Sequence, residues 1–170
     1  MINCKQLELP PLDGVDIHKM IHFFKLGNHL FLQRYKDAPH WKSFDLIKNS
    51  GYSPMLKHFP IIVRWVEMLQ REKFTTKIMT LYISVLAPRQ QIPWHKDMER
   101  PGFNKAFITS LQTDDSFIEF KEDKKYYYKK GCSYALQTGT EHRIINMSDE
   151  YRITLCTVPL KELDDDPMVA

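Results

Sequence analysis

Two histidines and one aspartate have the residue types and spacing of a metal site. His95 and Asp97 are separated by one residue. Successive side chains of a β-strand point to opposite faces, so these two would project from the same face and could bind one ion. His142 would add a second imidazole from a later strand. Two nitrogens and one carboxylate on one face leave other coordination positions open, which suits non-haem Fe(II). A His-x-Asp tripeptide alone is weak evidence, because an ordinary histidine near a strand end matches it equally well.

Arg152 and Thr154 are candidates for binding an anion beside this metal. They alternate along a predicted strand and therefore face the same side. If that side is the interior of a barrel, a buried guanidinium would bind a carboxylate through two hydrogen bonds, and the threonine hydroxyl would add another. The residues alone favour the alternative, in which Arg152 faces solvent and pairs with Asp149 or Glu150.

The second half of the chain has the pattern of a β-structure. From Lys77 onward, β-branched and aromatic residues alternate with polar ones between short turn signals such as Lys130-Gly131 and Thr138-Gly139-Thr140. Eight antiparallel strands of this kind predict a jelly roll. The first ligand pair would lie at the end of the second strand and His142 at the start of the seventh. The predicted strands are 77–87, 91–97, 104–112, 116–120, 125–129, 132–137, 141–147 and 151–159.

Residues 1–75 are predicted to form a helical support for this core. One helix would begin at Asp16 and end near Leu26, and two more would span Trp41–Ile47 and Met55–Leu69. Pro60 would lie in the first turn of the last helix or begin it afresh. The prolines of Leu7–Leu12 predict extended chain there. The expected fold is mainly β, a double-stranded β-helix (jelly roll, cupin-like) backed by N-terminal helices.

Two longer segments contain the residues of the candidate site. They are Leu86–Asp97 (LAPRQQIPWHKD) and Gly139–Leu155 (GTEHRIINMSDEYRITL). In their order and spacing, residues 76–160 resemble the catalytic core of the Fe(II)/2-oxoglutarate-dependent oxygenases, and they are most similar to the aspartyl/asparaginyl β-hydroxylase family.

The resemblance implies a role for each candidate residue. His95, Asp97 and His142 would bind Fe(II). Arg152, ten residues after His142, would pair with a carboxylate of the co-substrate 2-oxoglutarate, with Thr154 beside it. The implied activity uses O2 to hydroxylate an amino-acid side chain, free or in a peptide or protein, and releases succinate and CO2.

The chain departs from the family pattern at two places. Arg89 follows Pro88 where family members usually have glycine, which we expect to alter only a turn. Many members carry an Arg-x-His pair on the next strand, where this chain reads Asn104-Lys105-Ala106-Phe107. Lys105 or Asn104 is therefore the candidate partner for the other end of 2-oxoglutarate.

The substrate is less well indicated than the metal. Candidate wall residues are Trp94, Phe103, Phe107 and the tyrosines Tyr126–Tyr128, although each is more simply explained as core. The nucleic-acid demethylase branch of these oxygenases carries a second arginine six residues after the first, where this chain has Val158. Two alternatives stay open, a cupin-type metal protein with another co-substrate and a non-catalytic binding or structural jelly roll.

Composition bounds the remaining possibilities. With 170 residues, 43% hydrophobic and 26% charged, we expect one globular domain with a flexible tail at 161–170. A net charge of +3 without long runs of like charge does not indicate nucleic acid as a partner. The three separated cysteines argue against a disulfide framework, and no apolar run is long enough for a membrane span or signal peptide. These features predict a cytoplasmic protein.

Overall fold

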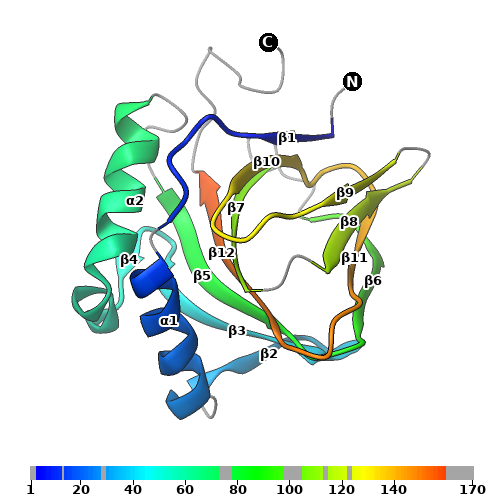
Figure 1. Cartoon of the computed structure of the whole chain (residues 1–170), viewed down its shortest axis with the longest axis horizontal. Helices are drawn as coiled ribbons and strands as arrows, with labels where there is room; N and C mark the ends of the chain where they lie inside the picture. Colours follow the sequence, from blue (N-terminus) through cyan, green and yellow to red (C-terminus); the bar gives the residue numbers. More distant parts are fainter. Residues whose placement is uncertain are drawn as a thin grey trace.

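The computed structural model describes residues 3–12, 14–27, 30–72, 78–97, 105–112, 115–121 and 124–159, and the predicted tail at 161–170 lies outside them. Its strands form two antiparallel sheets (Figure 1). The larger sheet has eight described strands, with β4 (Gly51–Tyr52) beside β3, in the order β1 (Cys4–Gln6), β10 (Ser133–Gln137), β7 (Lys105–Gln112), β12 (Arg152–Pro159), β5 (Ile78–Leu86), β3 (Ala38–Lys48) and β2 (Leu32–Tyr35). The smaller sheet has four, in the order β6 (Gln91–His95), β11 (His142–Asn146), β8 (Ser116–Phe120) and β9 (Lys125–Tyr127).

The eight strands predicted from the sequence are present with nearly the expected bounds. Along the chain they pass back and forth between the sheets, with β5, β7, β10 and β12 in the larger one and β6, β8, β9 and β11 in the smaller. Such interleaving closes the two sheets around a common interior, as in a jelly roll. The predicted fold class is therefore confirmed.

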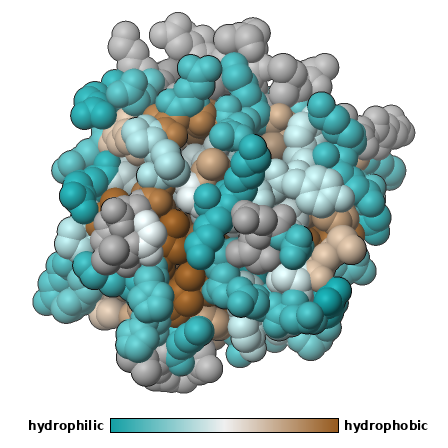
Figure 2. Space-filling view, viewed as in Figure 1, coloured by the Kyte–Doolittle hydropathy of each residue, from teal (hydrophilic) through white to brown (hydrophobic). Residues whose placement is uncertain are grey.

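The central strands of the larger sheet, such as β12, are buried on both faces. Helices α1 (Gly14–Gly27) and α2 (Pro60–Arg71) lie against one face, and the smaller sheet lies on the other side (Figure 1). Alternation along β12 divides its side chains: Ile153 and Leu155 belong to the hydrophobic cluster beneath the helices, while Cys156 belongs to the cluster between the sheets. The outer surface seen in this view is mostly hydrophilic, with hydrophobic residues gathered mainly on its left half (Figure 2).

Two of the three predicted N-terminal helices are present near their predicted positions. Helix α1 covers the expected 16–26. Pro60 begins α2 afresh, after a short 3₁₀ helix at Pro54–His58. The stretch Leu7–Leu12 is extended as predicted, and its ends donate backbone hydrogen bonds to Ser133 and Gly131. No helix among the described residues is long and apolar enough to span a membrane.

The predicted helix at Trp41–Ile47 is wrong, because this segment is part of strand β3 between β2 and β5. A register irregularity between Asp45 and Ile47 places two consecutive residues, Leu46 and Ile47, in buried positions. Trp41, Phe44 and Ile47 are also each three residues apart, which imitates the three-to-four-residue spacing of a helix. Strands β1, β2 and β4 were also not predicted, so residues 1–75 extend the sheet as well as supporting it.

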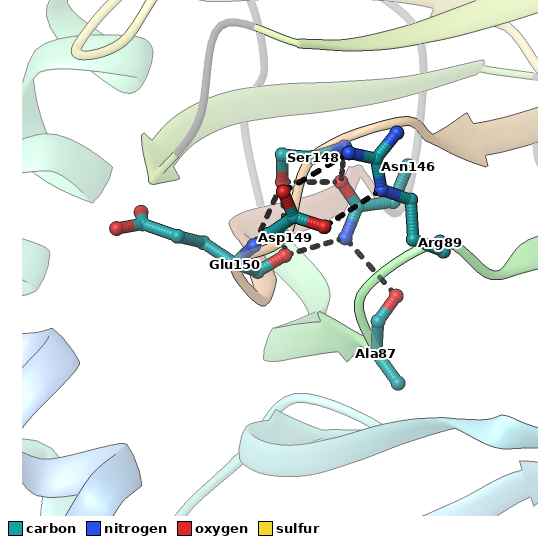
Figure 3. A network of polar contacts seen from close by, with 6 residues as sticks. All are labelled: Ala87, Arg89, Asn146, Ser148, Asp149 and Glu150. Carbon is teal, nitrogen blue, oxygen red and sulfur yellow. Dashed lines mark hydrogen bonds and ion pairs between the residues drawn. The ribbon is translucent and has the colours of Figure 1, made fainter.

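A network of polar contacts holds the turn from β11 to β12 (Figure 3). The buried Asn146 amide donates to the carbonyl oxygens of Ala87 and Glu150 at 3.0 and 2.7 Å, and more weakly to Leu86 at 3.3 Å. Its oxygen accepts from the Ser148 hydroxyl at 2.8 Å. The turn therefore has a fixed path, and β12 begins two residues after Glu150.

Arg89, at the position where the resemblance leads one to expect glycine, joins the same network. Its φ of 57° lies in the left-handed region, which explains why glycine suits this position. The guanidinium pairs side-on with Asp149 at 2.9 and 3.0 Å, and its backbone amide donates to Ser148. The side chain thus adds a contact across the two turns that glycine cannot make.

Replacing Asn146 with aspartate should destabilise the protein. A carboxylate oxygen would face carbonyl oxygens that now accept hydrogen bonds, at a cost of about 3 kcal/mol or more in the free energy of unfolding. Urea unfolding followed by circular dichroism measures this change. Arg89→Gly is the matched control in the same network and should leave the midpoint nearly unchanged, since it relieves backbone strain while removing an exposed ion pair. Equal stability of Asn146→Asp and the wild type would contradict the role given to the amide.

Candidate metal and co-substrate site

The pairing of β6 with β11 places the two candidate imidazoles opposite each other. His95 and His142 are partners in the antiparallel register, and their ring centroids lie 4.4 Å apart. Asp97 follows just after β6, where its backbone amide donates to Thr138 at 3.0 Å. The potential ligand atoms of these three residues all lie within 4.8 Å of one another, and no other such group of three occurs among the described residues. The structure thus brings the predicted ligands together.

Backbone carbonyls fix how both imidazoles are presented. Nδ1 of His95 lies 2.7 Å from the oxygen of Pro93, and Nδ1 of His142 lies 2.8 Å from that of Thr140. A carbonyl oxygen only accepts, so each Nδ1 carries the proton and each Nε2 keeps its lone pair. Nε2 of His95 lies 3.7 Å from a carboxylate oxygen of Asp97. Both rings are therefore oriented as metal ligands.

The burial of His142 favours the form that binds metal. Desolvation lowers its pKa below the ordinary value of a histidine, and the neighbouring His95 lowers it further. Since the neutral imidazole is the ligand, a depressed pKa keeps His142 competent at pH values below neutrality.

Arg152 lies in the same interior, and its position is costly for a cation. The residue is 1% exposed, and its Nη1 reaches only the hydroxyl of Thr154, at 3.4 Å. Among the described residues, Nε and Nη2 are buried without a hydrogen-bond partner, and no ion pair joins Arg152 to another residue. The solvent-facing alternative with Asp149 or Glu150 is thus not observed, since Asp149 pairs with Arg89 and Glu150 accepts from Gln112. A buried guanidinium with a free side-on edge is a ready binding site for a carboxylate.

One cavity between the sheets connects Arg152 with the metal ligands. Residues of strands and turns far apart in the sequence line it: Trp41, Tyr82, Ser84, His95, Asp97, Ala106, Ile108, Leu136, Thr138, His142, Ile144, Arg152 and Cys156. Sequence analysis did not single out Trp41, Tyr82 or Ser84. Tyr82 and Ser84 are two residues apart on a predicted strand, so they could have been recognised as sharing one face. Trp41 could not, because its segment was predicted to be a helix. Trp41 is held in place by a 2.8 Å hydrogen bond from its indole to Ser84.

The remaining residues predicted for the site lie in different parts of the structure. Phe107 is not at the site, because strand alternation turns it into the cluster beneath the helices. Trp94 is 41% exposed and lies on the outer side of β6 beside Arg143. Tyr126 packs against the cluster between the sheets, Tyr127 is exposed, and Tyr128 is buried in that cluster. Asn104 and Phe103 lie outside the described residues, and of Lys105 only the backbone at the start of β7 is described.

The donor set fits a divalent iron. Two neutral imidazole nitrogens and one carboxylate converge from one side, which leaves positions for small molecules, and this geometry is characteristic of non-haem Fe(II) sites. The hydrogen bonds at both Nδ1 atoms supply the outer support that metal-binding histidines require.

Comparisons with known proteins agree with this fold. The larger part of the chain, residues 19–159, matches the family model described as aspartyl/asparaginyl beta-hydroxylase. A prolyl-4-hydroxylase from Pseudomonas putida is similar in structure, with a TM-score of 0.62 at 9% identity over 92% of each chain. A viral collagen prolyl hydroxylase from Paramecium Bursaria Chlorella virus-1, solved as a 2-oxoglutarate complex, gives 0.61 at 14% identity over 92% of this chain and 95% of that one.

A third structure, an oxidoreductase of the 2OG-Fe(II) oxygenase family from Burkholderia pseudomallei, gives a TM-score of 0.60 at 12% identity over 92% of this chain and 83% of that one. At these identities the three likenesses show a shared fold. No curated protein sequence matches the chain.

Fold and site together define a jelly-roll protein of the hydroxylase type, with two histidines and one aspartate grouped at one end of the barrel. The chain belongs to the aspartyl/asparaginyl β-hydroxylase family.

Removing either histidine should abolish metal binding while the fold persists. His95→Ala and His142→Ala each delete one of three ligands, so we expect affinity for Fe(II) to fall by at least about 100-fold. Anaerobic equilibrium dialysis measures binding, and far-ultraviolet circular dichroism checks the fold. His18→Ala, at an exposed position of α1, is the matched control and should bind Fe(II) like the wild type. Unaltered binding in both site variants would refute the assignment.

Proposed function

We propose that this protein is a non-haem Fe(II)- and 2-oxoglutarate-dependent oxygenase that hydroxylates an amino-acid side chain, free or in a peptide or protein. His95, Asp97 and His142 would bind the iron, and Arg152 with Thr154 would bind the distal carboxylate of 2-oxoglutarate. Iron held there would supply the oxidative decarboxylation of 2-oxoglutarate by O2: one oxygen atom would enter succinate as CO2 leaves, and the other would be inserted into a C–H bond of the substrate.

The buried, unpaired guanidinium of Arg152 is the observation that supports this function over its alternatives. A cupin with another co-substrate would need the metal ligands but not a cation with two unsatisfied N–H groups in the same cavity. A purely structural jelly roll would gain stability from an apolar residue at this position. A dicarboxylate that also chelates iron accounts for both features at once.

The chain's own residues would do the remaining work. Carbonyls of Pro93 and Thr140 hold the imidazoles in the ligand tautomer, and the aromatic rings of Trp41 and Phe120 pack beside His95 and His142. These contacts limit the entry of water around the ligands and keep their positions fixed, so that little reorganisation is needed when the co-substrate binds.

We propose that the substrate side chain approaches through a cavity of about 130 Å³ next to His95. It is mostly apolar, is lined by Ala38, Trp41, Ile92, Pro93 and Trp94, and has Asp37 at its edge. Trp41 and His95 also line the metal cavity, so the two spaces adjoin. Arg143, paired with Glu119 at 2.6 Å, lies over the Trp94 ring at 4.9 Å and supports it.

A reducing compartment such as the cytoplasm fits the thiols. Cys4, Cys132 and Cys156 form no disulfide within the described residues, and Cys156 lines the site cavity. We therefore retain the prediction of a cytoplasmic protein with a small-molecule, peptide or protein substrate, for which nucleic acid is not indicated as a partner.

Anaerobic titration with Fe(II) and then 2-oxoglutarate tests the proposed function. A 2-oxo acid chelated to Fe(II) gives a weak visible charge-transfer band, which we expect in the wild type together with slow formation of succinate once O2 is admitted. Arg152→Met should lose the band at the same 2-oxoglutarate concentration. Its melting temperature without ligands should not fall, because methionine removes a buried unpaired charge. If the wild type binds Fe(II) and no band appears, the cupin alternative is favoured.

Trp94→Ala should separate substrate binding from co-substrate chemistry. A panel of peptides would be screened for stimulation of succinate formation. The variant should need at least about tenfold more of a stimulating peptide, while succinate formation without peptide stays unchanged. Tyr52→Ala, an exposed aromatic residue on β4, is the control. An identical peptide response in Trp94→Ala would place the substrate elsewhere.

A further inference from the structure

A second polar side chain is buried without a partner close to Arg152. Tyr128 follows β9 and is 1% exposed, within the cluster between the two sheets. Its backbone amide donates to Ser116, but its hydroxyl has no hydrogen-bond partner in the part of the chain that the structure describes. Buried hydroxyl groups in folded proteins are nearly always hydrogen-bonded, so this one calls for an explanation.

The Tyr128 ring lies directly beside the unpaired guanidinium. The Arg152 carbon Cζ is 5.1 Å from the ring centroid, a distance at which a cation and an aromatic ring attract each other. This attraction holds the two side chains together, but it satisfies neither the hydroxyl nor the Nε and Nη2 of Arg152. Three unsatisfied polar groups from two contacting residues are therefore collected in one part of the interior.

All three groups can donate a hydrogen bond at physiological pH. A guanidinium has no acceptor. Burial raises the pKa of Tyr128, so its hydroxyl keeps the proton. Burial also raises the pKa of Tyr82 and of Cys156, so neither of these neighbours supplies a negative charge. An anionic acceptor with more than one oxygen would satisfy all three donors.

We propose that the hydroxyl of Tyr128 is a second donor to the carboxylate bound by Arg152, so that the two residues together select a 2-oxo acid with a distal carboxylate. The inference rests on the proposed function and extends it to a positioning residue. Nε and Nη2 of an arginine lie on one edge and bind both oxygens of a carboxylate side-on, which leaves a lone pair for the tyrosine.

Tyr134 provides a matched control in the same cluster. Its ring packs edge-on against Tyr128, with the centroids 5.0 Å apart, but its hydroxyl already accepts a hydrogen bond from the Lys129 amide at 2.8 Å. Tyr134→Phe therefore removes a buried hydroxyl that has a structural partner. Tyr128→Phe removes one that has none.

The experiment compares two 2-oxo acids on the anaerobic Fe(II) protein. Dissociation constants come from the charge-transfer band for 2-oxoglutarate and for 2-oxovalerate, which has the same chelating end and a methyl group in place of the distal carboxylate. We expect Tyr128→Phe to weaken 2-oxoglutarate by about tenfold or more, the usual effect of a hydrogen bond to a charged group. Binding of 2-oxovalerate and Fe(II), and the melting temperature without ligands, should stay as in the wild type. Tyr134→Phe should lower stability without changing the ratio of the two dissociation constants.

Three outcomes would overturn the inference. They are an unchanged affinity of Tyr128→Phe for 2-oxoglutarate, an equal loss for both acids, and a failure of Tyr128→Phe to fold, which would show that the hydroxyl is structural. Absence of the band from the wild type with 2-oxoglutarate would instead reject the proposed function itself, so the two failures can be told apart.

Discussion

The antiparallel pairing of β6 with β11 is the constraint on which the site depends. It places His95 directly opposite His142, and a slip of one residue would turn one imidazole to the outer face of the smaller sheet. Ile144 faces Ile92 on one side and Ile118 on the other, all three within the core between the sheets. A register irregularity between His142 and Ile144 then brings His95, rather than Trp94, opposite His142. Hydrophobic packing thus fixes the geometry of the ligands before any metal is present.

The barrel interior must also hold a charged side chain. Apolar packing and this buried charge lie on opposite faces of the larger sheet. On the helix side of β12, Ile153 and Leu155 join a large apolar core with α1 and α2. On the barrel side, Arg152 and Thr154 are as deeply buried but polar. A cation without a counter-ion destabilises the protein, and the apolar core on the opposite face of the same strand is what offsets this cost. The unpaired state is understandable if selection acts on the complex with an anion rather than on the empty barrel.

The sequence predicted the barrel well and its surroundings less well. Alternation and turn residues located all eight barrel strands, because each is short, regular and bounded by residues such as Gly131. Strand β3 was missed since Trp41, Phe44 and Ile47 repeat at helical spacing, and its hydrogen-bonding partners in β2 and β5 are set by tertiary structure. For the site, spacing on a strand indicated which residues share a face but not which face is inside. Phe107 was offered as a candidate wall residue although core was the simpler explanation, and it does lie in the core beneath the helices. The contribution of Trp41 was not foreseen.

The ten-residue interval between His142 and Arg152 has a simple structural origin. Strand β11 accounts for the first half, His142–Asn146, and the turn that crosses from the smaller to the larger sheet accounts for the rest. Asn146 ends the strand and fixes the turn through its amide, which contacts the carbonyl of Glu150 just before β12. One continuous segment therefore bears the distal metal ligand at one end and the anion-binding arginine at the other. Since these would hold opposite ends of one co-substrate, any change in the length of that turn would shift the arginine relative to the metal, and the contacts from Arg89 to Asp149 and Ser148 resist such a change.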